Sequence, residues 1–363
     1  MTSSVGNKIR LSVFGESHGL AIGCTLEGVP SGVKIDFDAL MTQMSRRAPG
    51  KDKTATTRKE ADIPELISGV VDGVTTGAPI TIIIKNNDTK SHNYDNLRDN
   101  PRPSHADYAA SVKYGGANDI RGGGHFSARL TAPIVAAGAI CRQILKDEGI
   151  TVGGHILSIG GVEDKRFDPV NVTDTELEAL SSKLFALISP EKEKPMRAEV
   201  ESARLDCDSV GGAAELAAVG LPVGLGSHMF LGVENVVSNI LYGVPAVKGI
   251  SFGAGFGYAA LKGSEANDQM YFDENGAVKC YTNNCGGITG GMTNGMPLIV
   301  TVALKPTPSI AKEQKTVNLK TGENTTLKIE GRHDPCIVPR ALPVLEAALS
   351  IALLDLLALG EEV

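Results

Sequence analysis

Three short segments combine histidine with glycine or proline, a setting suited to proton transfer. They are FGESHG at 14–19, RPSHADY at 102–108 and RHDP at 332–335. An imidazole titrates near pH 6.5, so His18 and His105 have the chemistry of general acids or bases. Taken singly, each is better explained as a structural histidine. Three further histidines have no such surroundings and are interpreted as structural: His92, His155 and His228.

Basic residues gather in the same parts of the chain. Residues 46–59 hold six of them, opposed only by Asp52. Others near the motifs are Arg121, Arg129, Arg332 and Arg340. The whole chain carries a formal charge of −7, so local cationic clusters favour a small anionic ligand, whose carboxylate or phosphate matches the arginine fork. The competing interpretation is a solvated face, where each ion pair contributes only ~0–1 kcal/mol.

The segment 114–140 is the most specific feature of the sequence. Gly122-Gly123-Gly124 precede His125, and an Ala-rich run follows. A glycine-rich loop that enters a helix can present backbone N–H groups and the helix dipole to an anion. The spacing fits neither a Walker A loop nor GxGxxG, and GAGFGY at 253–258 misses the dinucleotide fingerprint as well. We therefore expect an anion-binding loop without a Rossmann fold.

Composition excludes several classes of protein. Glycine makes up 42 of the 363 residues, about 12% against a usual ~7%, which predicts a folded, loop-rich chain. The acidic balance, the absence of Trp and an aromatic content of 4% argue against nucleic-acid or anionic-membrane partners. The six cysteines form no CxxC pair, and the first residues lack the apolar core of a signal peptide. We expect a cytoplasmic enzyme with reduced thiols.

The most apolar segment, 341–360, is interpreted as a buried core helix or an oligomer-interface helix. It carries Glu346 and Asp355, nine residues apart and therefore on opposite helix faces. A membrane span would have to bury at least one of these acids, at a cost of ~2.5–3.5 kcal/mol. No membrane partner is expected.

Strands and helices are mixed along the chain. Expected strands are 22–28, 69–73, 80–85, 210–219 and 298–304, and expected helices are 38–47, 130–146, 174–188 and 341–359. The helix at 174–188 starts from a capping box of Thr173 and Glu176, with Leu177, Leu180 and Leu184 on one face. This mixture predicts an α/β or α+β sandwich.

A weak internal repeat indicates two related halves. LEGVPSGV at 26–33 matches AVGLPVGL at 218–225 in its G-x-P-x-G, and TTGAPITIIIK at 75–85 matches TNGMPLIVTVALK at 293–305. The two pairs occur in the same order. No Ser/Gly-rich or Pro-rich linker divides the chain, so residues 1–363 are expected to form a single domain.

Taken together, the motifs resemble the chorismate synthase family along nearly the whole chain. They occur in the family's order: GESHG, RRAPG, RPSHADY, YGG…RGGG…SAR, GLPVGLG, AVKG, NCGGITGG, LKPTPSI and GRHDPC. The resemblance implies a shikimate-pathway lyase that removes phosphate and a ring hydrogen from 5-enolpyruvylshikimate 3-phosphate by anti 1,4-elimination, giving chorismate. It also implies reduced FMN as cofactor, a homotetramer, and a β-α-β sandwich with helices between antiparallel sheets and long glycine-rich active-site loops.

The resemblance also assigns roles to individual residues. His18 would protonate the departing phosphate, His105 would keep the reduced flavin suitably protonated, and Asp334 would assist removal of the ring proton near flavin N5. Flavin contacts would come from His125, Phe126, Ser127, Pro245, Ala246, Gly290, Lys305, Pro306, Thr307, Pro308, Ser309 and Arg332. Substrate or NADPH would be bound by Arg46, Arg47, Lys53 and Arg129.

The sequence departs from the family pattern at three places. His125-Phe126-Ser127 stands where many members have Arg-Ser-Ser, Lys53 where Arg is common, and Pro245 at a position often Asn. Lysine offers a point charge in place of the bidentate fork of arginine, so contacts at Lys53 change in kind. The sequence shows no reductase segment, so we expect an external flavin reductase to supply reduced flavin, with NADPH as a candidate reductant.

Two other classes of function compete with the interpretation as a flavin-dependent lyase. A metal-dependent phosphohydrolase would use ligands suited to a divalent metal: Glu16, His18, His105, Asp107, His333 and Asp334. The other is a non-catalytic anion-binding module, which would bind the ligand without turnover.

Overall fold

The computed structural model describes residues 3–50, 62–87, 96–329 and 334–360. The α-helices are α1 (Phe37–Arg47), α2 (Asp107–Lys113), α3 (Thr131–Asp147), α4 (Asp174–Ser181), α5 (Glu193–Leu205), α6 (Val233–Leu241), α7 (Gly263–Ala266) and α8 (Val338–Gly360). The 3₁₀ helices are η2 (Arg121–Phe126), η3 (Ala128–Leu130), η4 (Pro190–Lys192), η5 (Met229–Leu231) and η6 (Gly255–Ala260). The strands are β1 (Ser4–Val5), β2 (Arg10–Gly15), β3 (Ala21–Glu27), β4 (Glu65–Ser68), β5 (Val70–Val71), β6 (Val74–Thr75), β7 (Ile80–Lys85), β8 (Thr151–Ile159), β9 (Val162–Glu163), β10 (Gly212–Val219), β11 (Val247–Phe252), β12 (Met270–Phe272), β13 (Val278–Cys280), β14 (Ile288–Thr289), β15 (Met292–Thr293), β16 (Leu298–Leu304), β17 (Gln314–Asn318) and β18 (Glu323–Leu327).

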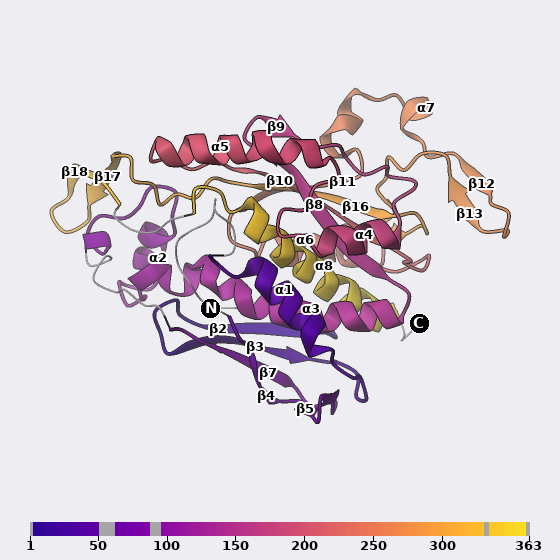
Figure 1. The fold of residues 1–363 in the computed structure, drawn as a ribbon, viewed down its shortest axis with the longest axis horizontal. Helices are drawn as coiled ribbons and strands as arrows, with labels where there is room; N and C mark the ends of the chain where they lie inside the picture. The colour runs from indigo at the N-terminus through magenta and orange to yellow at the C-terminus, as the bar shows by residue number, and fades with distance from the viewer. Residues whose placement is uncertain (1–2, 51–61, 88–95, 330–333, 361–363) are drawn as a thin grey trace.

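Two antiparallel sheets enclose a layer of helices. The first sheet has the order β1-β2-β3-β7-β4, and the second has the order β11-β16-β10-β8-β9. Helices α1, α3 and α8 lie between them, with α3 packed on the first sheet and α8 on the second (Figure 1). The expected β-α-β sandwich is confirmed.

The internal repeat corresponds to a repeated structure. In each half, the strand that ends in G-x-P-x-G (β3 or β10) pairs antiparallel with the strand that follows the second motif (β7 or β16). Thr75 and Thr293 occupy matching positions and donate to the proline carbonyl of G-x-P-x-G, at 2.7 and 2.6 Å. Each hydroxyl also accepts from the backbone N–H three residues after that proline, at 2.9 Å in both halves. The two halves therefore share their turn chemistry as well as their strand order.

Helices α3 and α8 form the centre of the core. A Cβ on Gly138 would lie 2.3 Å from the Cβ of Ala347, so the two helices approach closely there. Both helices are long and apolar enough to cross a membrane. Most residues of their apolar stretches, 78% and 83% respectively, are nevertheless buried inside the structure. Asp355 is fully buried and accepts from the backbone N–H groups of residues 7–9. The expected core helix is confirmed, with its acids bonded inside the fold.

Two expected elements differ from the structure. The helix predicted over 174–188 begins at its Thr173 cap but ends at Ser181, because the following residues pair with β8 through the Ile156 N–H to the Ala186 carbonyl at 2.9 Å. Leu184 consequently lies 39% exposed instead of sharing the buried face. The strand predicted over 69–73 is a small β5–β6 hairpin, since its turn needs positive φ at Asp72 and Gly73.

A buried histidine ties loops to the second sheet. His155 on β8 is fully buried, with Nδ1 3.2 Å from Asp164 and Nε2 3.1 Å from Glu215 on β10. Glu215 also accepts from the N–H of Phe167 at 2.8 Å and from Arg166 at 2.9 Å. Burial lowers the pKa of His155, but the two carboxylates outweigh it and raise that pKa above its ordinary value.

We therefore expect His155→Gln to change how stability depends on pH. A raised folded-state pKa stabilises the native state fully below about pH 6.5, and this contribution is lost as pH rises through the folded-state pKa. At pH 6 the variant should lose roughly 3–5 kcal/mol of unfolding free energy, measured with urea, and the gap should narrow toward pH 9. His228→Gln, at an exposed position, is the control. Parallel pH profiles for wild type and His155→Gln would contradict this.

Candidate active site

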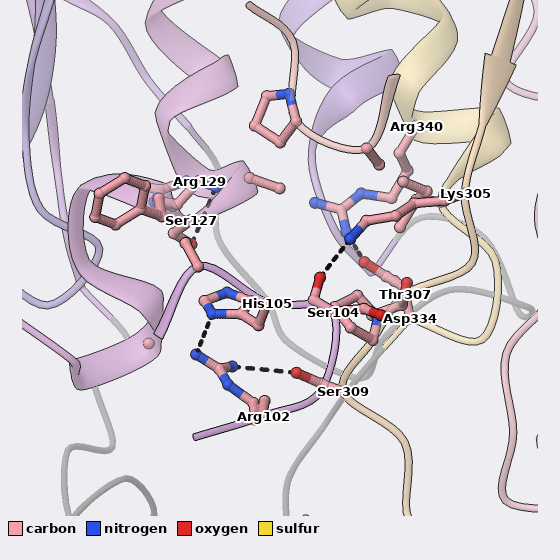
Figure 2. Close-up of a pocket in the computed structure, with 18 of the residues that line it drawn as sticks. Arg102, Ser104, His105, Ser127, Arg129, Lys305, Thr307, Ser309, Asp334 and Arg340 are labelled. Atoms are coloured by element: carbon pink, nitrogen blue, oxygen red, sulfur yellow. Dashed lines mark hydrogen bonds and ion pairs between the residues drawn. The ribbon is translucent and has the colours of Figure 1, made fainter. Parts of the chain in front are cut away.

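Loops from distant parts of the chain meet at one cavity of about 320 Å³ (Figure 2). Its wall is built from the end of α1, the loop before α2, the η2–η3 segment, the turn between α6 and β11, the segment after β16, and the start of α8. Both long core helices, α3 and α8, begin at this cavity. Because unsatisfied N–H groups give a helix start a partial positive charge, the position favours an anion.

The cavity is strongly cationic. Five of its lining residues are basic and one is acidic: Arg47, Arg102, Arg129, Lys305 and Arg340 against Asp334. Asp62 and Asp107 lie behind the wall and bond to three of these arginines. Five cations against three carboxylates leave an excess positive charge facing the cavity, which fits a ligand with several negative charges.

Asp62 holds two of these arginines in place. Its carboxylate accepts from Arg47 at 2.6 Å and also bonds Arg129, and both guanidinium groups are buried. Burial alone raises the pKa of Asp62, but the two cations outweigh it and lower that pKa, so the group is ionised at neutral pH. Burial lowers the pKa of Arg47 to about 10, which still leaves it charged. One anion thus orients two cations without neutralising both.

Asp107 does the same for His105 and Arg102. It accepts from His105 Nδ1 at 2.6 Å and from Arg102 at 2.7 Å, while Arg102 also donates to Ser309 at 3.1 Å. Burial raises the pKa of Asp107, but these hydrogen bonds outweigh it and hold the pKa far below its usual range. An ionised Asp107 makes Nδ1 the donor, so Nε2 is left for the glycine loop and the cavity: a Cβ on Gly123 would lie 3.4 Å from it.

Lys305 forms hydrogen bonds to two residues with strained backbone conformations at the edge of the cavity. Its ammonium donates to the carbonyl of Ser104 at 2.5 Å, and its backbone N–H donates to the carbonyl of Ala246 at 2.9 Å. Ser104 and Ala246 have φ of 58° and 76°, values that cost a residue with a Cβ free energy. Strain held in place by a lining residue is typical of a functional site.

His18 lies behind the wall rather than in it. The residue is 8% exposed and does not line the cavity, but a Cβ on Gly122, which does line it, would come within 2.1 Å of its ring. Gly122 has a φ of 59°, as the expected glycine-rich loop into α3 requires. His18 is therefore separated from the cavity by the backbone of one glycine.

Most of the predicted site residues meet at this cavity. Those lining it are His105, Phe126, Ser127, Pro245, Ala246, Lys305, Thr307, Pro308, Ser309, Asp334, Arg47 and Arg129. Pro306 belongs to the same segment but is not part of the wall. Lys53 and Arg332 lie outside the described residues.

Three predicted residues are directed elsewhere. Arg46 points into the helical layer, where it bonds Glu346 and donates to the carbonyl of Lys183 at 3.0 Å. The ring of His125 bonds to Ser3 at 2.7 Å and to the carbonyl of Gly15 at 2.8 Å, leaving its neighbour Phe126 to face the cavity. Gly290 sits in the β14–β15 hairpin and is absent from the wall. For these three, the geometry supports no contact with a ligand in the cavity.

Two further residues of the cavity received no individual role from the sequence, although Arg340 was named among the basic residues near the motifs and Arg102 lies within RPSHADY. Arg102 stands at the start of RPSHADY, and Arg340 donates to the backbone carbonyl of Arg47 at 3.0 Å and bonds Asp334. Their position inside or next to a motif was the available signal. Asp62 carried no such signal, because it lies in none of the motifs and its partners Arg47 and Arg129 are 15 and 67 residues away.

The geometry does not favour the metal-dependent hydrolase. Within residues 3–50, 62–87, 96–329 and 334–360, no group of three or more His, Cys, Asp or Glu side chains could hold a metal ion. The carboxylate of Asp107 is engaged by Arg102 and His105 instead. His333 lies outside the described residues.

The fold and the cavity together define an α+β sandwich enzyme whose site suits a small polyanionic substrate. The family profile described as chorismate synthase matches residues 9–358. Proteins named chorismate synthase from Thermococcus kodakarensis and Dehalococcoides mccartyi are 46% and 42% identical, over 96% and 98% of this chain and 96% of each relative. A crystal structure of chorismate synthase superposes with a TM-score of 0.75 at 29% identity, covering 98% of this chain and 93% of the other. The chain belongs to the chorismate synthase family and is a lyase of that activity in the shikimate pathway.

We expect Gly122→Ala to be more destabilising than Gly116→Ala. Both positions have positive φ, so both substitutions strain the backbone, but only a methyl on Gly122 would collide with His18. The additional loss of unfolding free energy should be about 1–3 kcal/mol by chemical denaturation. Equal losses in the two variants would show that His18 does not pack against this loop.

Proposed function

We propose that this enzyme eliminates phosphate and a ring hydrogen from 5-enolpyruvylshikimate 3-phosphate to give chorismate, with reduced FMN as cofactor. The main support is the convergence of five cations and His105 on one cavity. The proposed substrate carries a phosphate and two carboxylates, so it needs a site where positive charge exceeds negative charge. Fixed donors aimed at developing charge in such a site contribute roughly 2.7–4 kcal/mol each to transition-state stabilisation.

The residues present fit a bound flavin. The Oγ1 of Thr307 is buried and has no hydrogen-bond partner among the described residues, although Thr307 lines the cavity. Lys305, Ser309 and Ser127 add polar groups to the same wall, and Phe126 adds an aromatic ring. We propose that these residues hold the flavin. When bound, reduced FMN supplies electron density that no side chain offers.

The remaining roles follow from position. Asp334 lines the cavity and bonds Arg340, so it offers a fixed carboxylate to accept the ring proton. His105 presents Nε2 as a proton acceptor or donor beside the flavin, with its orientation set by Asp107. Arg47 and Arg129 would bind the phosphate. His18, next to Gly122, would protonate the phosphate as it departs, which assists a poor leaving group.

We also propose that the protein works as a homotetramer in the cytoplasm. Large apolar side chains lie exposed on η5 and on the β12–β13 hairpin, which extends away from the sandwich (Figure 1). Four of these side chains are about two-thirds exposed or more: Met229 at 72%, Phe230 at 84%, Met270 at 67% and Phe272 at 76%. Such side chains suit burial against other subunits. The six cysteines form no disulfide, in keeping with a reducing compartment.

The proposed reaction is tested by anaerobic incubation with the enolpyruvyl substrate and reduced FMN, following chorismate absorbance. We expect stoichiometric release of chorismate and phosphate, and none without reduced flavin. Oxidised FMN with NADPH should give no product until a separate flavin reductase is added. Release of phosphate without chorismate would favour a hydrolase, and binding without turnover would favour an anion-binding module.

His18→Ala and His105→Ala should each reduce turnover at least ~10-fold while the fold is retained, since positioned acids contribute ~10²–10⁴-fold. His228→Ala, at an exposed position, is the matched control and should retain wild-type turnover. Circular dichroism and urea unfolding would establish that the variants are folded. Rates near wild type in both active-site variants would remove the roles proposed for these imidazoles.

A further inference from the structure

One guanidinium group at the edge of the cavity connects parts of the chain that are 293 residues apart in sequence. It belongs to Arg340, which stands in the first turn of α8 and lines the cavity with a side chain that is 20% exposed (Figure 2). The backbone N–H of Arg340 donates to the carbonyl of Ile337 at 3.0 Å, and the neighbouring Val338 and Leu342 are fully buried. A well-anchored helix start therefore carries this side chain.

Arg340 donates from two of its nitrogen atoms to two different acceptors. Its Nε donates to the backbone carbonyl of Arg47 at 3.0 Å, and its Nη1 donates to the carboxylate of Asp334. Arg47 is the last residue of α1, where backbone carbonyls lack partners within the helix and favour a nearby cation. Because a guanidinium group is planar and rigid, the two bonds fix the carboxylate relative to the end of α1. A lysine ammonium would supply the same charge without this fixed geometry.

The Arg47 end of this bridge is also held by other contacts. The guanidinium group of Arg47 donates to Asp62 at 2.6 Å and to the carbonyl of Ala128 at 2.9 Å. Loss of Arg340 would therefore leave Arg47 in its place. Asp334, in contrast, would lose the bond that directs its carboxylate toward α1.

The proposed elimination has two ends that must be served at a fixed separation. Over the whole reaction, the electron pair of the C–H bond forms a ring double bond, the existing ring double bond shifts, and phosphate leaves with the electrons of the C–O bond. The proton passes to a carboxylate, and the phosphate is received by cations. The substrate ring sets the separation of the two ends, so the proton acceptor must be in register with the phosphate site. A misplacement of about 1 Å costs on the order of 10²-fold in rate.

We propose that Arg340 is a positioning residue, which keeps the proton-accepting carboxylate of Asp334 in register with the phosphate-binding Arg47. The inference rests on the proposed function for the roles of Asp334 and Arg47. Arg340 itself transfers no proton, because a guanidinium group stays protonated in proteins. Without the bridge, both chemical groups remain in the protein, but removal of the ring hydrogen becomes slow.

The kinetic test uses substrate in which the departing ring hydrogen is replaced by deuterium. At saturating substrate, Arg340→Ala should lower turnover at least ~10-fold, as expected for a misplaced acceptor. Its deuterium isotope effect on turnover should exceed that of the wild type, because proton removal has slowed relative to the other steps. Guanidinium chloride at a non-denaturing concentration should restore part of the turnover, whereas methylammonium chloride, which has the charge but not the planar geometry, should not. Arg204→Ala, which breaks an exposed pair with Glu201, is the control and should behave as wild type.

Two other outcomes would assign Arg340 a different role. A raised KM with wild-type turnover and isotope effect would show that Arg340 only binds substrate. Lower turnover with an unchanged isotope effect would show that it only supports the fold. Either result overturns the proposal. Arg340→Lys keeps the charge and the apolar stem, so it should fold even if Arg340→Ala does not, and it should also raise the isotope effect.

A crystal structure of the Arg340 variants tests the positioning independently of the reaction. We expect the carboxylate of Asp334 to move away from the end of α1, while Arg47 keeps its bond to Asp62. An Asp334 carboxylate that stays in its wild-type place would overturn the proposal. Failure of the wild-type enzyme to release chorismate would instead overturn the proposed function, wherever the carboxylate of Asp334 lies in the variants.

Discussion

Two buried carboxylates beside the cavity are each shared between two basic side chains rather than paired one to one. Asp62 serves Arg47 and Arg129, and Asp107 serves Arg102 and His105. A guanidinium group removed from water without any anion would be very costly, whereas full neutralisation would leave nothing to attract a ligand. Sharing satisfies both requirements, because each cation keeps a charged hydrogen-bond partner while the cavity keeps an excess of positive charge. The excess positive charge of the cavity depends on this balance.

The fold supplies the rigidity that such a balance needs. Two related halves place their sheets on opposite sides of a helical layer, and α3 and α8 meet so closely that Gly138 has no room for a side chain. Both helices begin at the cavity, so a well-packed core ends where the charges gather. Loops from both halves complete the wall, and Lys305 links two of them by holding Ser104 and Ala246 in strained conformations. Since the strain is held by tertiary hydrogen bonds, the cavity has a defined shape before a ligand arrives.

The two arginines in the last turn of α1 point to different parts of the structure. Arg47 faces the candidate active site, whereas Arg46 enters the cluster with Glu346 and Arg142. Neighbouring residues in a helix differ by about 100° in direction, and here Arg46 and Arg47 reach different partners. The same helix turn thus contributes one arginine to the cavity and one to the charge cluster of the helical layer. Shared carboxylates are a general device of this fold rather than a property of one site.

The sequence alone was enough to predict local chemistry and repeated patterns. It was not enough to predict which residues far apart in the chain contact each other in the fold. Glycine and proline at fixed spacings, the Thr173 cap and the β-branched runs specify local backbone conformation, so the strands 80–85 and 298–304, the core helix α8 and the two-half architecture could be predicted. Motif order likewise placed His105, Lys305 and Asp334 in one site. The direction of Arg46, the position of His18 behind Gly122 and the role of Asp62 were decided only by tertiary packing. Each of these depends on contacts between residues far apart in the chain, which no local pattern encodes, because the same side chain satisfies the same local geometry whichever distant partner it meets.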